Sequence, residues 1–263
     1  MVRGAERNEK ADGDRCCRLQ REKCRKTEAA DGGLVMLDIK NVSKKFDAST
    51  GIEDLDICLE EGRIYAFVGP NGAGKTTLIK CMAGLLSPGL GSILLNGTPT
   101  LKRETKRYIG YAIDSEDAYP KLKLIDLLDV ISRLKFDIVD REEIKYYLER
   151  YELAESSNRF FSKLSMGMKK KVEMIMSFMG DPDLILLDEP TNGVDATGII
   201  RIKEDILTAK KRGAIVVITS HMLDFLVKVA DVCYFMDKGR LVDKVEVTED
   251  SNLEETYKEI YKV

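Results

Sequence analysis

The pattern of hydrophobic and polar residues changes after the first 35 positions of the chain. Residues 1–35 mix charged residues with cysteines and follow neither the period of a helix nor that of a strand, so no regular structure is predicted there. Apolar and polar residues then alternate around 37–39 and 42–46 and again at 52–59, which predicts half-exposed edge strands. We therefore expect a disordered or non-native extension at 1–35, followed by one folded domain at 36–263.

Three later runs are apolar at nearly every position, at 184–188, 214–219 and 232–236. Strands of this kind are covered on both faces, as in a parallel sheet. A helical period at 199–212 separates the first two runs and gives the strand-helix-strand rhythm of an α/β fold. A short amphipathic helix is predicted at 253–261. The fold class predicted is therefore α/β, with a mostly parallel sheet as its core.

The apolar period is helical over a long stretch between the predicted strands. Ile125 and Leu128 lie at helical spacing, and Ile144 and Leu148 repeat the pattern further along the chain. This stretch predicts a helical insertion at about 115–180.

Charge and hydropathy restrict the classes of protein that this chain can represent. The formal net charge is −3, whereas a nucleic-acid-binding domain is expected to be basic, so nucleic acid is not expected as a partner. The three lysines at 169–171 are interpreted as a solvated helix face. No apolar run approaches the roughly 20 residues that cross a bilayer, so a membrane role would need another chain to span it.

The six cysteines are scattered and form no disulfide framework. Those within apolar segments, where free cysteine behaves as a small buried hydrophobe, are Cys58, Cys81 and Cys233. A reduced cytoplasm is the simplest compartment for them. Adjacent Cys16 and Cys17 with one distant partner fit no ordinary zinc spacing. The Gly-Gly pair shortly before Met36 can be encoded by a purine-rich ribosome-binding sequence, which suggests Met36 as the native start.

A glycine-rich stretch lies between the apolar, strand-like run 64–68 and a helical period at 77–86. Its residues are Gly69, Pro70, Asn71, Gly72, Ala73, Gly74, Lys75, Thr76 and Thr77. This spacing of glycines, lysine and hydroxyl is that of a phosphate-binding loop, in which backbone N–H groups hold a phosphate chain at a helix N-terminus. Lys75 would reach the β- and γ-phosphates, and the Thr76 hydroxyl would bind Mg²⁺. The loop alone indicates a nucleotide and no particular reaction.

Two acidic residues, Asp188 and Glu189, follow directly on the apolar run that begins at Leu184. Ligands of open α/β sheets bind at the carboxyl ends of the strands. Asp188 can hold Mg²⁺ through its water shell, and Glu189 can orient and polarise an attacking water. Phe46 is a candidate to stack on a purine base, and it is equally interpretable as an ordinary strand aromatic.

From about Leu37 to Asp243 the chain resembles the ATP-binding subunit of an ABC transporter. The motifs that carry the resemblance, in chain order, are the phosphate loop, a signature motif at 164–168, the acidic pair after Leu187, a D-loop at 192–195 and a switch histidine motif at 219–221. The sequence is most similar to bacterial exporters of peptides and antibiotics whose membrane protein is a separate chain. The resemblance implies a P-loop NTPase fold with an antiparallel edge β subdomain and an inserted α-helical subdomain.

The resemblance also assigns further site residues. His221 would brace the γ-phosphate, in a charge state that the sequence does not assign, and it joins Lys75 and Glu189 as an expected catalytic residue. Ser165 and Gly167 would complete the ATP site of a second subunit, and Asp195 belongs to the D-loop among the nucleotide-contacting residues.

Two positions depart from the family pattern. Asp114 stands near the position where the family usually has glutamine, and as a carboxylate it could still bind Mg²⁺. Met166 and Met168 replace a usual glycine and glutamine within the signature motif, which leaves Ser165 and Gly167 intact.

The function implied is that of a Mg²⁺-dependent ATPase that binds ATP and pairs with itself or another ATPase subunit. Such a chain drives a separate polytopic membrane permease from the inner face of the cell membrane. The alternative is a soluble ABC-type ATPase, for which chromosome maintenance would need a long heptad run that is missing here. Translation versions carry two such domains, and a cofactor-assembly scaffold stays open. A P-loop kinase would leave the signature and switch motifs unexplained.

Overall fold

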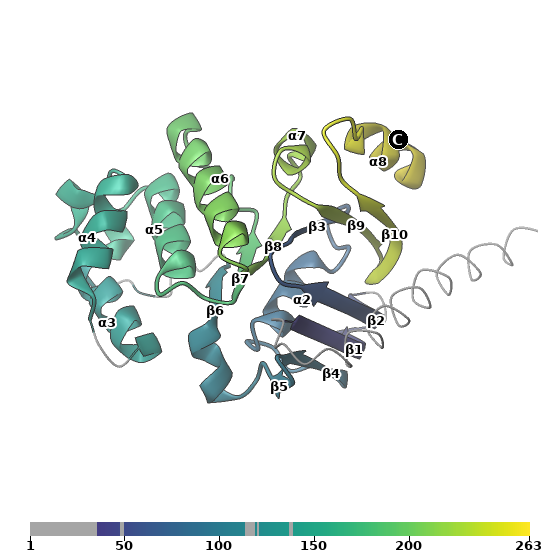
Figure 1. Ribbon diagram of the computed structural model, residues 1–263, viewed down its shortest axis with the longest axis horizontal. Coiled ribbons are helices and arrows are strands. Elements are labelled where there is room, and N and C mark those ends of the chain that lie inside the picture. Colours follow the sequence, from purple (N-terminus) through teal and green to yellow (C-terminus); the bar gives the residue numbers. More distant parts are fainter. Residues whose placement is uncertain (1–35, 48–49, 114–118, 120, 137–138) are drawn as a thin grey trace, which may run out of the picture.

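The computed structural model describes residues 36–47, 50–113, 119, 121–136 and 139–263. The expectations for residues 1–35 and for Asp114 lie outside the described residues. Figure 1 shows helices α3 and α4 gathered at one end, a central sheet, and the N-terminal strands and α8 towards the opposite end.

A six-stranded sheet in the order β10-β9-β3-β8-β7-β6 lies at the centre of the fold. Its strands are β3 (Ile64–Val68), β6 (Ile109–Ala112), β7 (Leu184–Asp188), β8 (Ile215–Thr219), β9 (Val232–Asp237) and β10 (Arg240–Glu246). Every neighbouring pair is parallel except β9 with β10, which confirms the predicted, mostly parallel core. The sequence did not indicate β10, because this edge strand is largely exposed and lacks an apolar run.

A second, antiparallel sheet has the order β2-β1-β4-β5. Its strands are β1 (Met36–Lys45), β2 (Gly51–Glu60), β4 (Leu90–Leu95) and β5 (Thr98–Pro99). The aliphatic residues of β1 and β2 within the predicted runs are buried and alternate with more exposed, mostly polar residues, as the sequence pattern indicated. This sheet confirms the antiparallel edge subdomain.

Helices and loops make up the rest of the described chain. The α-helices in this part of the chain are α2 (Lys75–Met82), α3 (Leu124–Phe136), α4 (Arg141–Arg150), α5 (Met166–Phe178), α6 (Ala196–Lys211), α7 (Leu223–Val227) and α8 (Leu253–Tyr261). Short 3-10 helices are η1 (Arg103–Tyr108), η2 (Ala154–Ser156) and η3 (Phe161–Lys163). Helices α3, α4 and α5 lie between β6 and β7 in the chain, within the stretch predicted to be helical. The sequence did not indicate the short helix α7.

Helix α2 differs from the helical period expected at 77–86. It begins at Lys75, because Gly74 adopts a left-handed conformation with φ of 100° and ends the loop there. It ends at Met82, and Gly84 then turns the chain with φ of 61°. The helix N-terminus therefore lies inside the predicted phosphate loop.

The central sheet separates two hydrophobic cores, and β3 contributes to both. Ile64 and Val68 pack with residues of α3 to α8 on one face, whereas Tyr65 and Phe67 pack with α2 and the antiparallel sheet on the other. A strand that is buried on both faces is held rigidly. The loop that follows Val68 is therefore built on a fixed support.

The prediction of a solvated lysine face at 169–171 is wrong. Lys170 and Lys171 are only 9% and 8% exposed, and each forms an ion pair, with Glu173 and Asp195 respectively. Buried ammonium groups of this kind need such partners, and of the two only Glu173 lies near its lysine in the sequence. Of the three cysteines in the predicted apolar segments, Cys58 is only partly buried, whereas Cys81 and Cys233 are buried.

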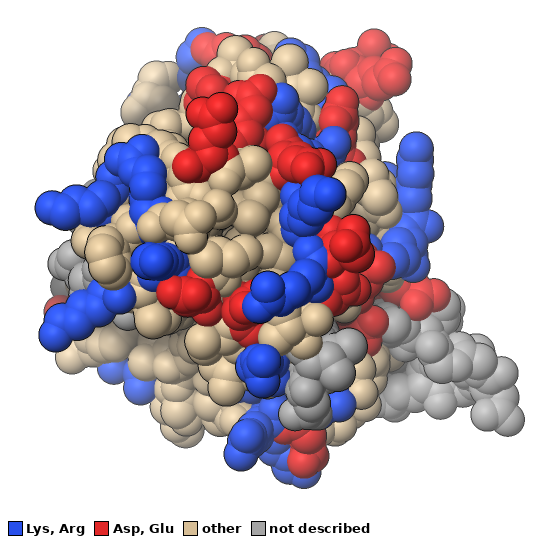
Figure 2. All heavy atoms as spheres, turned by 90° about the vertical axis from the view of Figure 1, so that its left-hand side faces the viewer, with Lys and Arg blue, Asp and Glu red and all other residues tan. Residues whose placement is uncertain are grey.

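The surface at the α3–α4 end carries both signs of charge. Figure 2 shows acidic and basic side chains interspersed with uncharged ones on this face. Within the described part of the chain, no helix is both long enough and apolar enough to cross a membrane.

Candidate nucleotide-binding site

The predicted phosphate loop connects the buried end of β3 to the first turn of α2. A Cβ atom at Gly69 would lie 2.2 Å from the carbonyl oxygen of Met236, and one at Gly74 would lie 2.6 Å from that of Gly51. Gly74 also adopts a left-handed conformation, which disfavours other residues. The N-terminus of α2 has no side-chain cap. Backbone N–H groups are therefore available to an anion at the position where the helix dipole is positive.

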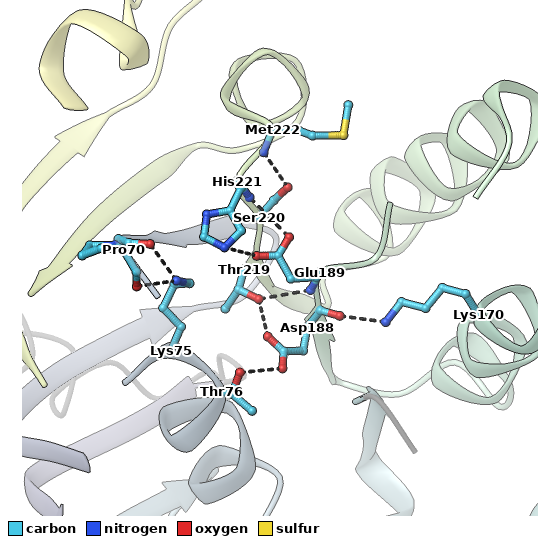
Figure 3. Close-up of polar contacts among 11 residues, drawn as sticks. Pro70, Lys75, Thr76, Lys170, Asp188, Glu189, Thr219, Ser220, His221 and Met222 are labelled. Carbon is cyan, nitrogen blue, oxygen red and sulfur yellow. Dashed lines mark hydrogen bonds and ion pairs between the residues drawn. The ribbon is translucent and has the colours of Figure 1, made fainter. Parts of the chain in front are cut away.

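Lys75 extends back across this loop. Its ammonium nitrogen Nζ donates hydrogen bonds to the carbonyl oxygens of Gly69, at 2.7 Å, and Pro70, at 3.1 Å (Figure 3). Burial lowers the pKa of Lys75, while the nearby carboxylates of Glu189 and Asp188 oppose that shift. A cation that is held between main-chain carbonyls and acidic groups at the mouth of the loop is suited to receive phosphate oxygens.

Asp188 connects the end of β7 to the phosphate loop. Its Oδ2 accepts a hydrogen bond from the Thr76 hydroxyl at 2.8 Å, and its Oδ1 accepts one from the Thr219 hydroxyl at the end of β8. Thr76 and Asp188 thus place two hard oxygen donors side by side from two different elements. Mg²⁺ is usually held by one or two carboxylates together with substrate phosphates and water, so this donor set fits it. Among the described residues, no group of three or more His, Cys, Asp or Glu side chains is placed to hold a metal by itself.

Glu189 directly follows Asp188 and adopts a left-handed backbone conformation with φ of 47°. Its carboxylate accepts a hydrogen bond from the backbone N–H of His221 at 3.3 Å, and its Oε1 lies 3.1 Å from the imidazole Nε2. The Glu189 side chain is mostly buried, whereas that of His221 is about half exposed. The structure thus brings both predicted catalytic residues to the same edge of the sheet as Lys75 (Figure 3).

A cleft of about 570 Å³ opens beside these residues. It is lined by Thr76, Met166, Lys169, Lys170, Glu173, Asp188, Glu189 and Asn192. The cleft therefore lies between the start of α2, the end of β7 and the first turns of α5. Sequence reasoning missed Lys170 and Glu173 as part of its wall.

The signature and D-loop residues lie at the N-termini of two neighbouring helices. Ser165 is exposed and caps α5 by accepting a hydrogen bond from the N–H of Met168 at 3.3 Å. Asp195 caps α6 by accepting one from the N–H of Gly198 at 3.0 Å, and its bond with Lys171 lowers the pKa of the Asp195 carboxyl. A Cβ atom at Gly167 would lie 2.5 Å from the carbonyl oxygen of Gly193, so the two motifs touch each other.

Phe46 lies in a bend just beyond β1 and is 60% exposed, so it does not belong to either hydrophobic core. The ammonium group of Lys44 lies 5.9 Å from the centre of its ring. An exposed aromatic ring of this kind can stack on a flat partner, which keeps Phe46 a candidate for base stacking.

Comparison with known proteins gives consistent matches over most of the described chain. Residues 52–192 match the protein family described as "ABC transporter". The chain is 32% identical to the lantibiotic transport ATP-binding protein SrtF of Streptococcus pyogenes, over 84% of this chain and 96% of that protein. It is 30% identical to the bacitracin transport ATP-binding protein BcrA of Enterococcus faecalis, over 81% of this chain and 70% of that protein. A solved structure titled "Structure of ATP binding subunit of ABC transporter" matches with a TM-score of 0.78 and 26% identity, over 86% of this chain and 99% of that one.

Proposed function

Because the chain belongs to the ABC transporter family and is one of its ATP-binding subunits, we propose that it hydrolyses Mg·ATP to power the export of a peptide or antibiotic. The names of similar proteins support this class of cargo, since they describe lantibiotic and bacitracin transport. The export itself would take place through a separate membrane subunit.

The hydrogen bond between Thr76 and Asp188 is the observation that carries the ATPase proposal. It brings an oxygen of the phosphate loop and an oxygen of the adjacent strand within 2.8 Å, as shared coordination of one hard cation requires. When bound there, Mg²⁺ would neutralise charge on the phosphate oxygens. Lys75 would bind the β- and γ-phosphates from the other side. A ligand role for Asp114 stays a prediction.

Glu189 would orient and polarise the water that attacks the γ-phosphate. Support comes from its position next to Asp188 and from the two contacts with His221 that fix its carboxylate at the cleft. His221 would brace the γ-phosphate from its half-exposed position. In phosphoryl transfer most of the catalytic effect comes from such positioning and electrostatic stabilisation.

A second ATPase subunit would complete the site in a head-to-tail pair. Ser165 is exposed at the N-terminus of α5, where its hydroxyl and the nearby N–H of Gly167 can approach a phosphate group of a partner. Met166 beside them is also exposed and lines the cleft. Asp195 and Phe46 are further proposed nucleotide contacts, from the partner and from the same chain respectively.

A membrane permease would dock at the inner face of the cell membrane. A second cavity near the C-terminal end of α2 supports a docking position, because apolar and aromatic side chains line it. They include Leu85, which is half exposed, together with Tyr111, Tyr119 and Met176. Lys80 and Glu173 also line the cavity, and an exposed apolar side chain such as Leu85 beside a cavity with a polar rim is typical of a protein contact surface.

Replacing Glu189 by glutamine tests the proposal. The Glu189→Gln variant keeps the shape of the side chain but cannot accept the proton of the attacking water. We expect ATP affinity to stay within about threefold of the parent and phosphate release to fall by roughly a hundredfold or more. The ATP-bound variant should also accumulate as a dimer in size-exclusion chromatography. The matched control is Glu259→Gln, on the exposed face of α8, which should hydrolyse ATP like the parent.

A Glu189→Gln variant that releases phosphate at the parental rate would contradict the role of Glu189. The transport assignment is tested separately, by purifying the chain from its source cell in mild detergent. Recovery of a polytopic membrane protein supports transport. A complex made only of soluble proteins would favour the cofactor-assembly alternative.

A further inference from the structure

The wall of the cleft contains a buried lysine, Lys170, that no motif accounts for. We propose that Lys170 is a positioning residue, which holds the peptide bond between Asp188 and Glu189 in the orientation that ATP hydrolysis needs. The inference rests on the proposed ATPase function and adds a residue to it.

The peptide bond between Asp188 and Glu189 is held from two sides. Its carbonyl oxygen, which belongs to Asp188, accepts a hydrogen bond of 2.9 Å from Nζ of Lys170 on α5. Its N–H, which belongs to Glu189, donates to the carbonyl oxygen and the hydroxyl of Thr219 on β8, both at 3.1 Å. Figure 3 shows Lys170 approaching from the side opposite to Thr219. The plane of this peptide is therefore fixed by α5 and β8 together.

The orientation of this peptide determines where the Glu189 carboxylate lies. Glu189 has φ of 47°, a conformation that is uncommon for a residue with a side chain and that persists only when its surroundings impose it. The Asp188 carboxylate is independently held by Thr76 and Thr219. Release of the peptide would consequently move Glu189 far more than Asp188, and it would affect the attacking water more than the bound cation.

Lys170 is itself fixed by a buried ion pair. Its Nζ lies 3.3 Å from Oε2 of Glu173, one helical turn further along α5, and the two side chains are 10% and 5% exposed. Burying such a pair is costly, and an apolar pair of the same volume often stabilises a fold as well or better. We therefore explain the ion pair by its effect on the cleft: it fixes the ammonium group of Lys170 in a position that points at the Asp188 carbonyl.

Two substitutions separate the hydrogen bond from simple packing. Lys170→Met keeps most of the volume and removes the donor, whereas Lys170→Gln keeps an N–H donor without the charge. We expect kcat of Lys170→Met to fall ten- to a hundredfold, on the order of the loss caused by a misplaced catalytic group. ATP affinity should stay within about threefold of the parent, since the phosphate loop is untouched. Lys170→Gln should recover at least part of the lost kcat.

The matched control is Lys211→Met, which removes an exposed lysine at the end of α6. It should leave both kcat and ATP affinity at the parental value. Because Lys170→Met leaves Glu173 buried with one partner fewer, the double variant Lys170→Met/Glu173→Gln removes the charge imbalance. It should show the same loss of kcat with a melting temperature closer to that of the parent.

A double-mutant cycle with Glu189→Gln shows whether Lys170 acts through Glu189. If it does, Lys170→Met should reduce the residual hydrolysis of the Glu189→Gln variant by less than about twofold, because the effects of residues that act as one unit do not add. A full ten- to hundredfold further loss in the Glu189→Gln background would overturn the inference. So would parental kcat in both Lys170→Met and the double variant.

These results are distinguishable from a failure of the proposed function. If the parent hydrolyses ATP and Glu189→Gln does not, the ATPase proposal stands whatever the Lys170 variants do. If the parent hydrolyses ATP and Glu189→Gln is equally active, the role of Glu189 and the inference both fail, whereas a parent that binds ATP without hydrolysing it would contradict the ATPase proposal itself.

Discussion

Helices α2 and α5 both begin near the nucleotide cleft, and they begin in opposite ways. The N-terminus of α2 follows Gly74 and has no side-chain cap, whereas α5 follows Ser165, whose hydroxyl accepts a hydrogen bond from its own helix. The first arrangement leaves backbone N–H groups free to bind a phosphate group of a nucleotide held by the same subunit. The second presents an exposed hydroxyl at the surface, in the manner expected of a contact to another chain. In the proposed function, α2 would therefore provide affinity for ATP within one subunit, and α5 would complete the ATP site of a second subunit.

The largest loss of ATP affinity is expected from removing the ammonium group of Lys75 at the N-terminus of α2. Lys75→Met should reduce ATP affinity by about a hundredfold, which corresponds to roughly 2.7 kcal/mol, and should abolish measurable hydrolysis. The physical reason is that Lys75 is the buried ammonium group at the mouth of the loop. Binding of a fluorescent ATP analogue measures the change, with Lys211→Met as the control. An affinity within threefold of the parent would show that backbone donors alone account for binding.

The features that the sequence predicted at this site are those that local chemistry determines. Glycines at fixed spacing between a strand and a helix specify the loop, and an apolar run ending in Asp188 specifies the end of a buried strand. Both depend on a few neighbouring residues, which is why they were read correctly as elements of an α/β fold. Their assigned roles in binding and catalysis stay predictions.

The features that the sequence could not provide depend on distant partners. Lys170 lies among three consecutive lysines, and its hydrogen bond to the carbonyl of Asp188, eighteen residues away, could not be inferred from its neighbours in the chain. The left-handed conformation of Gly74, after which α2 begins, occurs where Gly74 packs closely against Gly51, 23 residues earlier in the chain. Strand β10 pairs with β9 through backbone bonds, and exposed side chains give it no apolar pattern. Tertiary contacts therefore decide these features.

A smaller effect, on turnover and hardly on ATP affinity, is expected from changing Ser165 at the N-terminus of α5. Ser165→Ala removes the helix cap, which typically lowers stability by about 1 kcal/mol, and it removes the hydroxyl proposed to reach a partner's nucleotide. ATP affinity of the diluted chain should change less than twofold, while turnover at high protein concentration should fall roughly tenfold. Phosphate release measured across a range of protein concentrations separates the two. Ser165→Thr, which keeps the hydroxyl, is the matched control.

A loss of ATP affinity in dilute Ser165→Ala as large as that of Lys75→Met would contradict the distinction drawn between the N-termini of α2 and α5. It would mean that both helix N-termini act on the same nucleotide within one chain. Equal turnover of Ser165→Ala and the parent at every protein concentration would remove Ser165 from the site.

The smallest effect concerns a third helix N-terminus, that of α6, where Asp195 contacts Lys171 of α5. The bond with Lys171 holds the pKa of Asp195 below its ordinary value of 3.8, so the folded state favours the ionised carboxylate. The resulting stabilisation is fully present above that ordinary pKa and is lost as the pH falls through the lower value of the folded state. Asparagine also caps helices well, so Asp195→Asn isolates the charge from the cap.

Melting temperatures of the parent and Asp195→Asn should therefore differ slightly at pH 6 to 7, with the parent higher, and should converge as the pH falls below about 4. The difference should be small because the Asp195 side chain is largely exposed, and solvent screens its ion pair with Lys171. Added salt should reduce it further, which provides an independent check at constant pH. A difference that persists unchanged at acidic pH and in added salt would show that the charge of Asp195 is not the source of the stabilisation. In that case the N-terminus of α6 would resemble that of α5, where an uncharged hydroxyl caps the helix. Of these three helix N-termini, only that of α2 would then depend on a charged side chain, namely Lys75.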